Sequence, residues 1–285
     1  MASQVTRVAR FSTGTVDIHP EHAHRGRTPM YWWILTSRRW LPARPINVYV
    51  IEHTHGVVVF DTGQDRASVT DLGYFPGGPV GIVYQRLARF DIPADETLSA
   101  GLTRLGYAAG DVTTAVISHL HQDHIGGIRQ LAHADLLVSA DEWRWLQRPL
   151  AEARGLLTDH IELPGLHWTT VDFTPLRDPG LRPFTTGHDA FGDGTLVLLP
   201  TPGHTPGSMS LLVRRPDAAP LLLVGDLTYD IDAFDRGVVG GVGSRRQLQR
   251  TGAMVRALRS THPGLAILAA HDPAAAGLLD DATAA

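Results

Sequence analysis

Cysteine is missing from the 285-residue sequence. Its absence excludes disulfides, thiolate metal ligands, cysteine nucleophiles and iron–sulfur clusters. Any bound metal ion must therefore be held by histidine and carboxylate side chains. A chain without cysteine fits the reducing cytoplasm, so we expect a cytoplasmic protein, although secreted chains without disulfides also exist.

Lysine is missing as well, because all 25 basic residues are arginine. A Schiff-base lysine and a P-loop lysine are thereby excluded. The formal net charge is −4, and charges of both signs are interspersed along the chain. We therefore expect neither a nucleic acid nor a membrane surface as a partner.

Long apolar runs are the third absence. No run approaches the roughly 20 residues that a membrane span needs, and residues 1–20 lack the apolar stretch of a signal peptide. The chain is nevertheless 43% hydrophobic and only 19% charged, so it can bury a sizeable core.

Short, mostly β-branched apolar stretches alternate with helical patterns, which predicts a mixed α/β protein. A hairpin is expected at 47–60 and a long helix at about 245–259. Because no linker divides the chain, we expect one domain over residues 1–285, with an aromatic-rich N-terminal segment at 1–45 and a frayed tail after about 279. The other expected strands are 113–118, 136–139, 196–199, 209–213, 221–224 and 266–270.

Four potential metal ligands lie within six residues directly after a predicted buried strand. They are His119, His121, Asp123 and His124. In an extended or turning loop, His119 and His121, which are two residues apart, can point to the same side, while Asp123 and His124 turn toward a second point. This arrangement predicts two neighbouring metal sites.

Further potential ligands follow other predicted strands, namely His204, Asp226 and His271. A lone histidine at a strand end more often makes an ordinary hydrogen bond, and 15 histidines produce some clusters by chance. The recurrence of such residues at several strand ends favours metal binding, because strand ends are where α/β folds place their chemistry.

The order HxHxDH, then His, Asp and His, resembles the metallo-β-lactamase superfamily, as does Phe60-Asp61-Thr62-Gly63. The resemblance covers roughly residues 46–272 and implies an α/β fold, the αβ/βα four-layer sandwich of two mixed β-sheets flanked by helices. It also implies two divalent metal ions. Zn²⁺ suits the nitrogen and oxygen ligands, and Mn, Fe or Co could occupy the same sites.

The resemblance also assigns the ligands residue by residue. It implies that His119, His121 and His204 bind one metal, that Asp123, His124 and His271 bind the other, and that Asp226 bridges both. It further places Asp61 behind the metals as a hydrogen-bond partner of a ligand. The alternative for Asp61 is an ordinary turn-forming residue.

Individual residues narrow the choice within the superfamily. The antibiotic-degrading dizinc members use a cysteine that this chain lacks, and the diiron oxidoreductases have Glu where this chain has His121. Tyr229 follows Asp226 by three residues, a spacing similar to that of N-acyl homoserine lactonases. We therefore expect a dinuclear hydrolase in which a metal-bridging hydroxide opens a lactone, Tyr229 stabilises the oxyanion and Asp123 carries the proton.

Two alternative functions stay open, and so does the role of the aromatic-rich N-terminal residues. The chain could be another hydrolase of this fold, such as a phosphotriesterase, an arylesterase or a thioesterase, or a non-catalytic metal-binding protein. The aromatic-rich residues could line an acyl-chain pocket of the small-molecule substrate, or pack in the core or at the contact of a homodimer. These residues are Met30, Tyr31, Trp32, Trp33 and Trp40, together with Tyr74 and Phe75.

Overall fold

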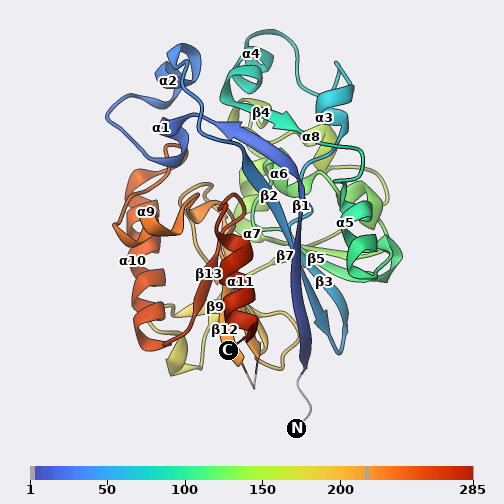
Figure 1. Ribbon diagram of the computed structural model, residues 1–285, viewed down its shortest axis with the longest axis vertical. Helices are drawn as coiled ribbons and strands as arrows, with labels where there is room; N and C mark the ends of the chain where they lie inside the picture. The colour runs from blue at the N-terminus through green and yellow to red at the C-terminus, as the bar shows by residue number, and fades with distance from the viewer. Residues whose placement is uncertain (1–3, 216–217, 285) are drawn as a thin grey trace.

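Two β-sheets form the centre of the protein in a computed structural model that describes residues 4–215 and 218–284 (Figure 1). The larger sheet has the strand order β4-β1-β2-β3-β5-β6-β7. Its strands β1, β2, β3 and β4 pair antiparallel, whereas β3, β5, β6 and β7 run parallel. The bounds are β1 Val5–Ile18, β2 Arg44–His53, β3 Gly56–Phe60, β4 Ala88–Asp91, β5 Val112–Val116, β6 Asp135–Ser139 and β7 His167–Val171.

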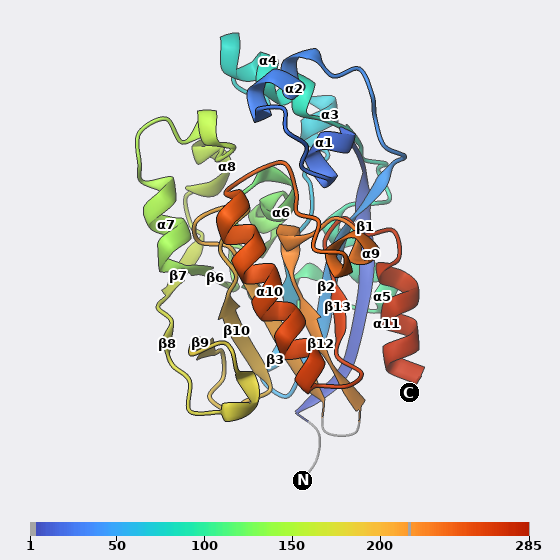
Figure 2. The same cartoon turned by 90° about the vertical axis from the view of Figure 1, so that its left-hand side faces the viewer.

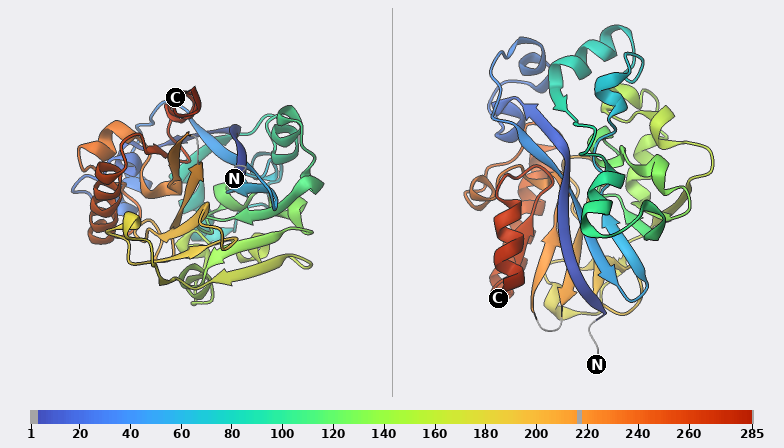
Figure 3. Two further views of the ribbon diagram at one scale, coloured as in Figure 1. Left: turned by 90° about the horizontal axis from the view of Figure 1, so that it is seen from below. Right: turned by 45° about the vertical axis from the view of Figure 1, so that its right-hand side comes forward.

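The smaller sheet has the order β13-β12-β11-β10-β9-β8 and is antiparallel except for the pair β12 and β13. Seen from below, the two sheets lie face to face (Figure 3). The bounds are β8 Thr174–Pro175, β9 Thr186–Asp189, β10 Leu196–Pro200, β11 Met209–Arg215, β12 Ala218–Leu223 and β13 Ala266–Leu268.

Helices cover the outer faces of both sheets. The longest, α10, has an amphipathic sequence and lies across the smaller sheet (Figure 2). No described helix combines the length and apolar character needed to cross a bilayer. The bounds are α1 Pro20–Ala23, α2 Met30–Thr36, α3 Ala67–Thr70, α4 Gly78–Leu87, α5 Leu98–Leu105, α6 Gln122–Ile125, α7 Ala140–Leu146, α8 Thr158–Ile161, α9 Ile231–Asp235, α10 Arg245–Thr261 and α11 Ala275–Ala284.

The apolar core follows from strands that are hydrophobic on both faces. In β10, Leu196 and Leu198 pack between the sheets, whereas Val197 and Leu199 pack against the outer helices. Side chains alternate across a strand, so a continuous apolar run is what a strand covered on both sides requires. The expected four-layer sandwich is thereby confirmed.

Most predicted elements are present with small shifts in their bounds. The hairpin is β2–β3, and α10 extends two residues beyond the expected helix end. The expectation of a frayed tail was wrong within the described residues, because α11 buries Leu279 and Ala282 against the core between the sheets. The N-terminal strand β1 was not predicted, since its polar residues break the apolar alternation.

Candidate metal centre

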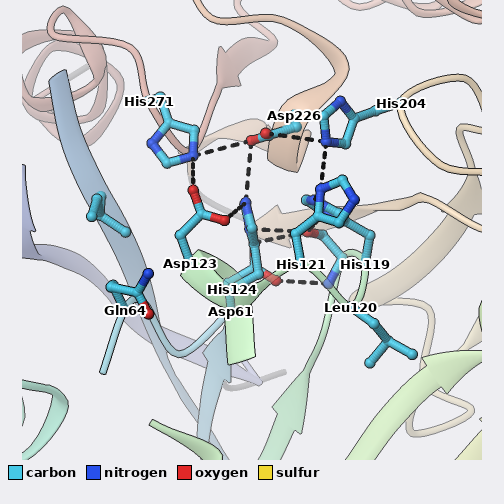
Figure 4. A network of polar contacts seen from close by, with 12 residues as sticks. Asp61, Gln64, His119, Leu120, His121, Asp123, His124, His204, Asp226 and His271 are labelled. Carbon is cyan, nitrogen blue, oxygen red and sulfur yellow. Dashed lines mark hydrogen bonds and ion pairs between the residues drawn. The ribbon is translucent and has the colours of Figure 1, made fainter. Parts of the chain in front are cut away.

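The carboxyl ends of several strands meet at one edge of the sandwich. Parallel strands end at the same edge of a sheet. The pair β3 and β5 thus places Asp61 beside the segment that starts at Ser118, and the pair β12 and β13 places Asp226 beside His271. Figure 4 shows that the side chains from both sheets point toward one another there.

Three histidines bring one ring nitrogen each to a common point. His121 Nδ1 is 3.1 Å from His119 Nε2 and 2.9 Å from His204 Nε2. Burial is the main cause that lowers the pKa of His119 and of His204 well below the ordinary value. These imidazoles are therefore neutral at pH 7, which leaves nitrogen lone pairs for a cation.

A second group consists of Asp123, His124 and His271. His271 Nε2 is 3.3 Å from Asp123 Oδ2, and His124 Nε2 is 3.8 Å from Asp123 Oδ1. Each of the two groups of three has ligand atoms within 4.8 Å of one another, which is compact enough to hold a metal ion.

Asp226 lies between the two groups (Figure 4). Its Oδ2 is 3.5 Å from His204 Nε2, and its Oδ1 is 3.3 Å from His124 Nε2 and 3.4 Å from His271 Nε2. The structure therefore brings together all seven residues expected as ligands, and the two groups that the resemblance implied are among the compact groups that it forms. We call these seven residues the donor cluster.

The donor cluster fits divalent cations better than protons. His124 Nε2 and Asp226 Oδ1 are both buried, and although they lie 3.3 Å apart, neither forms a hydrogen bond among the described residues. Nδ1 of His271, the ring nitrogen that faces away from the cluster, contacts the Pro45 carbonyl at 3.0 Å. Nδ1 of His124 contacts Asp61 Oδ2 at 2.8 Å. Such outer partners orient an imidazole so that its other nitrogen can face a metal.

The carboxylates Asp61 and Glu142 hold the ligand-bearing loops from behind. Asp61 accepts hydrogen bonds from the Ser118 amide at 2.7 Å and the Ser118 hydroxyl at 2.9 Å, in addition to its contact with His124. Its expected place behind the cluster is what the structure shows. Asp61 and Ser118 are both buried, so these bonds are shielded from water.

Glu142 was not identified from the sequence. Its carboxylate accepts from the Leu120 amide at 3.1 Å, the Gly207 amide at 3.0 Å and the Thr205 hydroxyl at 2.6 Å. It thereby joins the loop of His119 and His121 to the loop of His204. Burial raises its pKa, and these hydrogen bonds oppose that effect. A glutamate on the apolar side of α7 was the available sequence signal.

Tyr229 is buried at the same cluster. Its hydroxyl donates to Asp226 Oδ2 at 2.9 Å, and burial raises its pKa well above the ordinary value. The phenol is thus protonated at neutral pH and is a hydrogen-bond donor. It lines a small cavity of about 60 Å³ together with His121, Asp123 and His271.

The sequence profile of the metallo-beta-lactamase superfamily matches residues 41–271, most of the chain. The chain belongs to this superfamily. An N-acyl homoserine lactonase, AttM, from Rhizobium radiobacter is 30% identical over 231 residues, which cover 80% of this chain and 82% of that protein. The resemblance inferred from the histidine pattern is thereby confirmed, and with it the expectation of a metal-dependent hydrolase.

Solved structures agree with the superfamily fold. An N-acyl homoserine lactone hydrolase with N-hexanoyl-L-homoserine at its catalytic metal centre has a TM-score of 0.74 and 21% identity, covering 96% of this chain and 95% of that one. The dizinc quorum-quenching lactonase AidC has a TM-score of 0.64 and 16% identity, covering 95% and 91%. At these identities the superfamily neighbours support the fold and not a substrate.

The geometry predicts how metal content responds to loss of one ligand. The His271→Ala variant removes a nitrogen from the second group only, so we expect metal content to fall from about two divalent ions per chain toward one. Elemental analysis after gel filtration measures this content. The exposed His133 provides the control, because His133→Ala should leave the content unchanged. Wild-type protein with one ion at saturation would contradict a dinuclear centre.

Proposed function

We propose that this chain is a dinuclear metal-dependent lactonase that opens N-acyl homoserine lactones or related lactones. The observation that carries the proposal is the Tyr229 hydroxyl, which reaches Asp226 at 2.9 Å in the wall of the small cavity. A buried phenol there can donate to a substrate oxygen that develops negative charge. The similarity to N-acyl homoserine lactonases supports the same activity.

The seven residues of the donor cluster are the proposed metal ligands. His119, His121 and His204 would hold one ion, the other group of three a second, and Asp226 would contact both. Histidine and carboxylate ligands suit Zn²⁺. When bound, two such ions activate a water molecule and polarise the substrate carbonyl.

The side chains of this protein then have three tasks. The activated water adds its oxygen to the lactone carbonyl carbon, and Tyr229 donates a hydrogen bond to the carbonyl oxygen as its charge grows. Asp123 receives the proton of the attacking water and passes it to the ring oxygen as the carbon–oxygen bond breaks. The product is the open hydroxy acid. Asp123 is suited to this transfer because it lies in the same cavity wall as Tyr229.

A large cavity of about 630 Å³ offers a place for an acyl chain. It shares His121, His204 and Gly155 with the small cavity, so the two spaces adjoin at the donor cluster. A cavity with an apolar wall favours an alkyl chain over a polar group. Apolar side chains from α2 and α4 line it, among them Met30, Tyr31, Ile34, Val80, Val83 and Leu87.

The aromatic-rich segment therefore divides between the two roles considered for it. Tyr31 lines the large cavity, whereas Trp33 is buried and Trp40 packs against His19 with ring centroids 4.0 Å apart and the rings tilted by 30°. Trp32 is 65% exposed. Tyr74 is buried against His160 and lines neither of these two cavities.

A substrate panel tests the proposed activity. It should contain acyl homoserine lactones of several chain lengths, simple γ- and δ-lactones, aryl esters, thioesters and paraoxon-type phosphotriesters, each measured as kcat/KM with metal-loaded protein. We expect the largest kcat/KM for an acyl homoserine lactone. A larger value for an ester, thioester or phosphotriester than for every lactone would identify a different hydrolase of this fold.

Removing the Tyr229 hydroxyl should slow the reaction without releasing metal. A donor aimed at a developing oxyanion contributes about 10²- to 10³-fold to kcat, so Tyr229→Phe should lower lactone turnover by about that factor. Tyr107→Phe is the control and should leave turnover unchanged. The Tyr107 hydroxyl contacts Glu52 near the carboxyl end of β2 and lines neither cavity. Turnover of Tyr229→Phe equal to wild type would remove the phenol from the mechanism.

Filling the large cavity should discriminate against long acyl chains. Val83 lines the cavity, whereas the adjacent Ile82 is 52% exposed on the same helix and does not. Each methylene that leaves water contributes about 0.8 kcal/mol, so Val83→Trp should lower kcat/KM for a decanoyl lactone at least about tenfold more than for a butanoyl one. Ile82→Trp should lower both equally or not at all. Equal losses in Val83→Trp would argue against this cavity as the acyl site.

A further inference from the structure

His22 lies beside Tyr229 in a part of the chain that no ligand pattern indicated. It belongs to the short helix α1 and is buried. Its Nε2 is 3.2 Å from the Tyr229 hydroxyl, and the two rings meet edge to face with centroids 5.1 Å apart. The residue also lines the small cavity at the donor cluster. Its position raises the question of what it does for the phenol.

The hydrogen atoms around the Tyr229 hydroxyl can be assigned by counting. The phenol oxygen contacts Asp226 Oδ2 at 2.9 Å, His22 Nε2 at 3.2 Å and His204 Nδ1 at 3.4 Å. Asp226 is one of the proposed ligands of the divalent ions, and a carboxyl group binds a metal ion as a carboxylate. An ionised carboxylate only accepts, so the single phenolic hydrogen points to Asp226 and both imidazoles donate to the phenol oxygen.

This assignment determines the tautomer of His22. Burial lowers the pKa of His22 to about 4, so the imidazole is neutral at pH 7 and has one hydrogen. That hydrogen is on Nε2, where it is donated to Tyr229. The other nitrogen, Nδ1, is buried and has no hydrogen-bond partner among the described residues.

An unpartnered buried nitrogen makes His22 a poor choice for stability alone. A polar group that is buried without a hydrogen bond destabilises the folded state, whereas an apolar side chain at the same place would not. Packing beside Trp33, whose ring centroid is 5.8 Å away, would be available to an apolar residue as well. The single hydrogen bond to Tyr229 is the contact that only a polar side chain supplies.

We propose that His22 is a positioning residue for Tyr229, whose phenolic hydrogen it directs into the donor cluster. By donating to the phenol oxygen, His22 occupies a lone pair of that oxygen. The phenol is then held with its hydrogen on the side of the donor cluster, where Asp226 accepts it when no substrate is bound and a substrate oxygen can take its place. The donated bond also makes this hydrogen a stronger donor. The inference rests on the proposed function, in which Tyr229 donates to the substrate oxygen.

The main chain around His22 is held rigidly enough for this task. The His22 carbonyl accepts from the Gly241 amide at 2.7 Å. Arg25 donates to the carbonyl oxygens of Gly240 at 2.9 Å and Gly241 at 2.6 Å. A Cβ atom on Gly240 would lie 3.0 Å from the Tyr229 ring, so the loop closes tightly over the phenol. His22, Tyr229 and this loop thus form one packed unit.

Three substitutions of His22, to leucine, asparagine and glutamine, separate a positioning role from a packing role. The amide nitrogen of glutamine reaches about as far as Nε2 of histidine, whereas that of asparagine reaches only about as far as Nδ1. One neutral hydrogen bond corresponds to about a tenfold rate effect. We expect His22→Leu and His22→Asn to lower kcat about tenfold with KM within about twofold of wild type, and His22→Gln to restore kcat to within about threefold.

A double-substitution cycle tests whether the effect passes through the phenol. In the Tyr229→Phe background, His22→Leu should cause no further loss of kcat, because the oxygen that His22 contacts is gone. The control is His24→Leu, two residues along the same segment, which should leave kcat unchanged. Crystal structures supply a measurement besides activity. The Tyr229 oxygen should stay about 2.9 Å from Asp226 in His22→Gln and move away in His22→Leu.

Several results would overturn the proposal. They are equal kcat for His22→Gln and His22→Asn, a loss that persists in Tyr229→Phe, or an unmoved phenol in His22→Leu. If His22→Leu does not fold, as judged by thermal melting and metal content, the glutamine and asparagine variants still decide. The assays use whichever panel substrate has the highest kcat/KM, so a failure of the lactonase proposal is distinguishable from a failure of the positioning role.

Discussion

Seven histidine and aspartate side chains converge at one edge of the sandwich. The local structure depends on the hydrogen bonds or cations that occupy their nitrogen and oxygen lone pairs. Three imidazole nitrogens lie about one hydrogen-bond length apart, with His121 Nδ1 at 2.9 Å from His204 and 3.1 Å from His119. A neutral imidazole has only one hydrogen. In His119 and His204 the second ring nitrogen, Nδ1, contacts the Ser118 hydroxyl and the Tyr229 hydroxyl, respectively. Divalent cations neutralise such a cluster better than hydrogen bonds do.

The buried carboxylates behind the cluster belong to the same constraint. Asp61 joins the end of β3 to the Ser118 segment, and Glu142 joins the loop of His119 to the loop of His204. Each links segments that are far apart in the sequence. They hold the ligand loops in place through buried hydrogen bonds, which are strong because water is excluded. The geometry of the donor cluster therefore depends on every loop that contributes a residue to it and not on the HxHxDH segment alone.

The N-terminal part of the chain adds what the donor cluster lacks. Helix α2, together with α4, lines the large apolar cavity, and α1 places His22 beside Tyr229. In Figure 2 these helices lie at the end of the molecule where the ligand-bearing loops gather. The proposed metal ligands thus lie from His119 onward, whereas the residue proposed to position Tyr229 and much of the apolar cavity wall come from the chain before it. This division fits a superfamily in which one cluster serves many substrates.

The sequence by itself determined the mixed α/β class and, through its resemblance to the superfamily, the four-layer sandwich and the seven residues of the donor cluster. Apolar strands followed by His119, Asp226 and His271 carry this information locally, because strand ends and ligand types are readable residue by residue. Glu142, His22 and the walls of the large cavity could not be found this way. Glu142 acts on loops about 20 and 60 residues away in the sequence, and His22 meets a tyrosine 207 residues distant. Only the tertiary structure decided these contacts, since a hydrogen bond depends on distance in space and no local pattern encodes it.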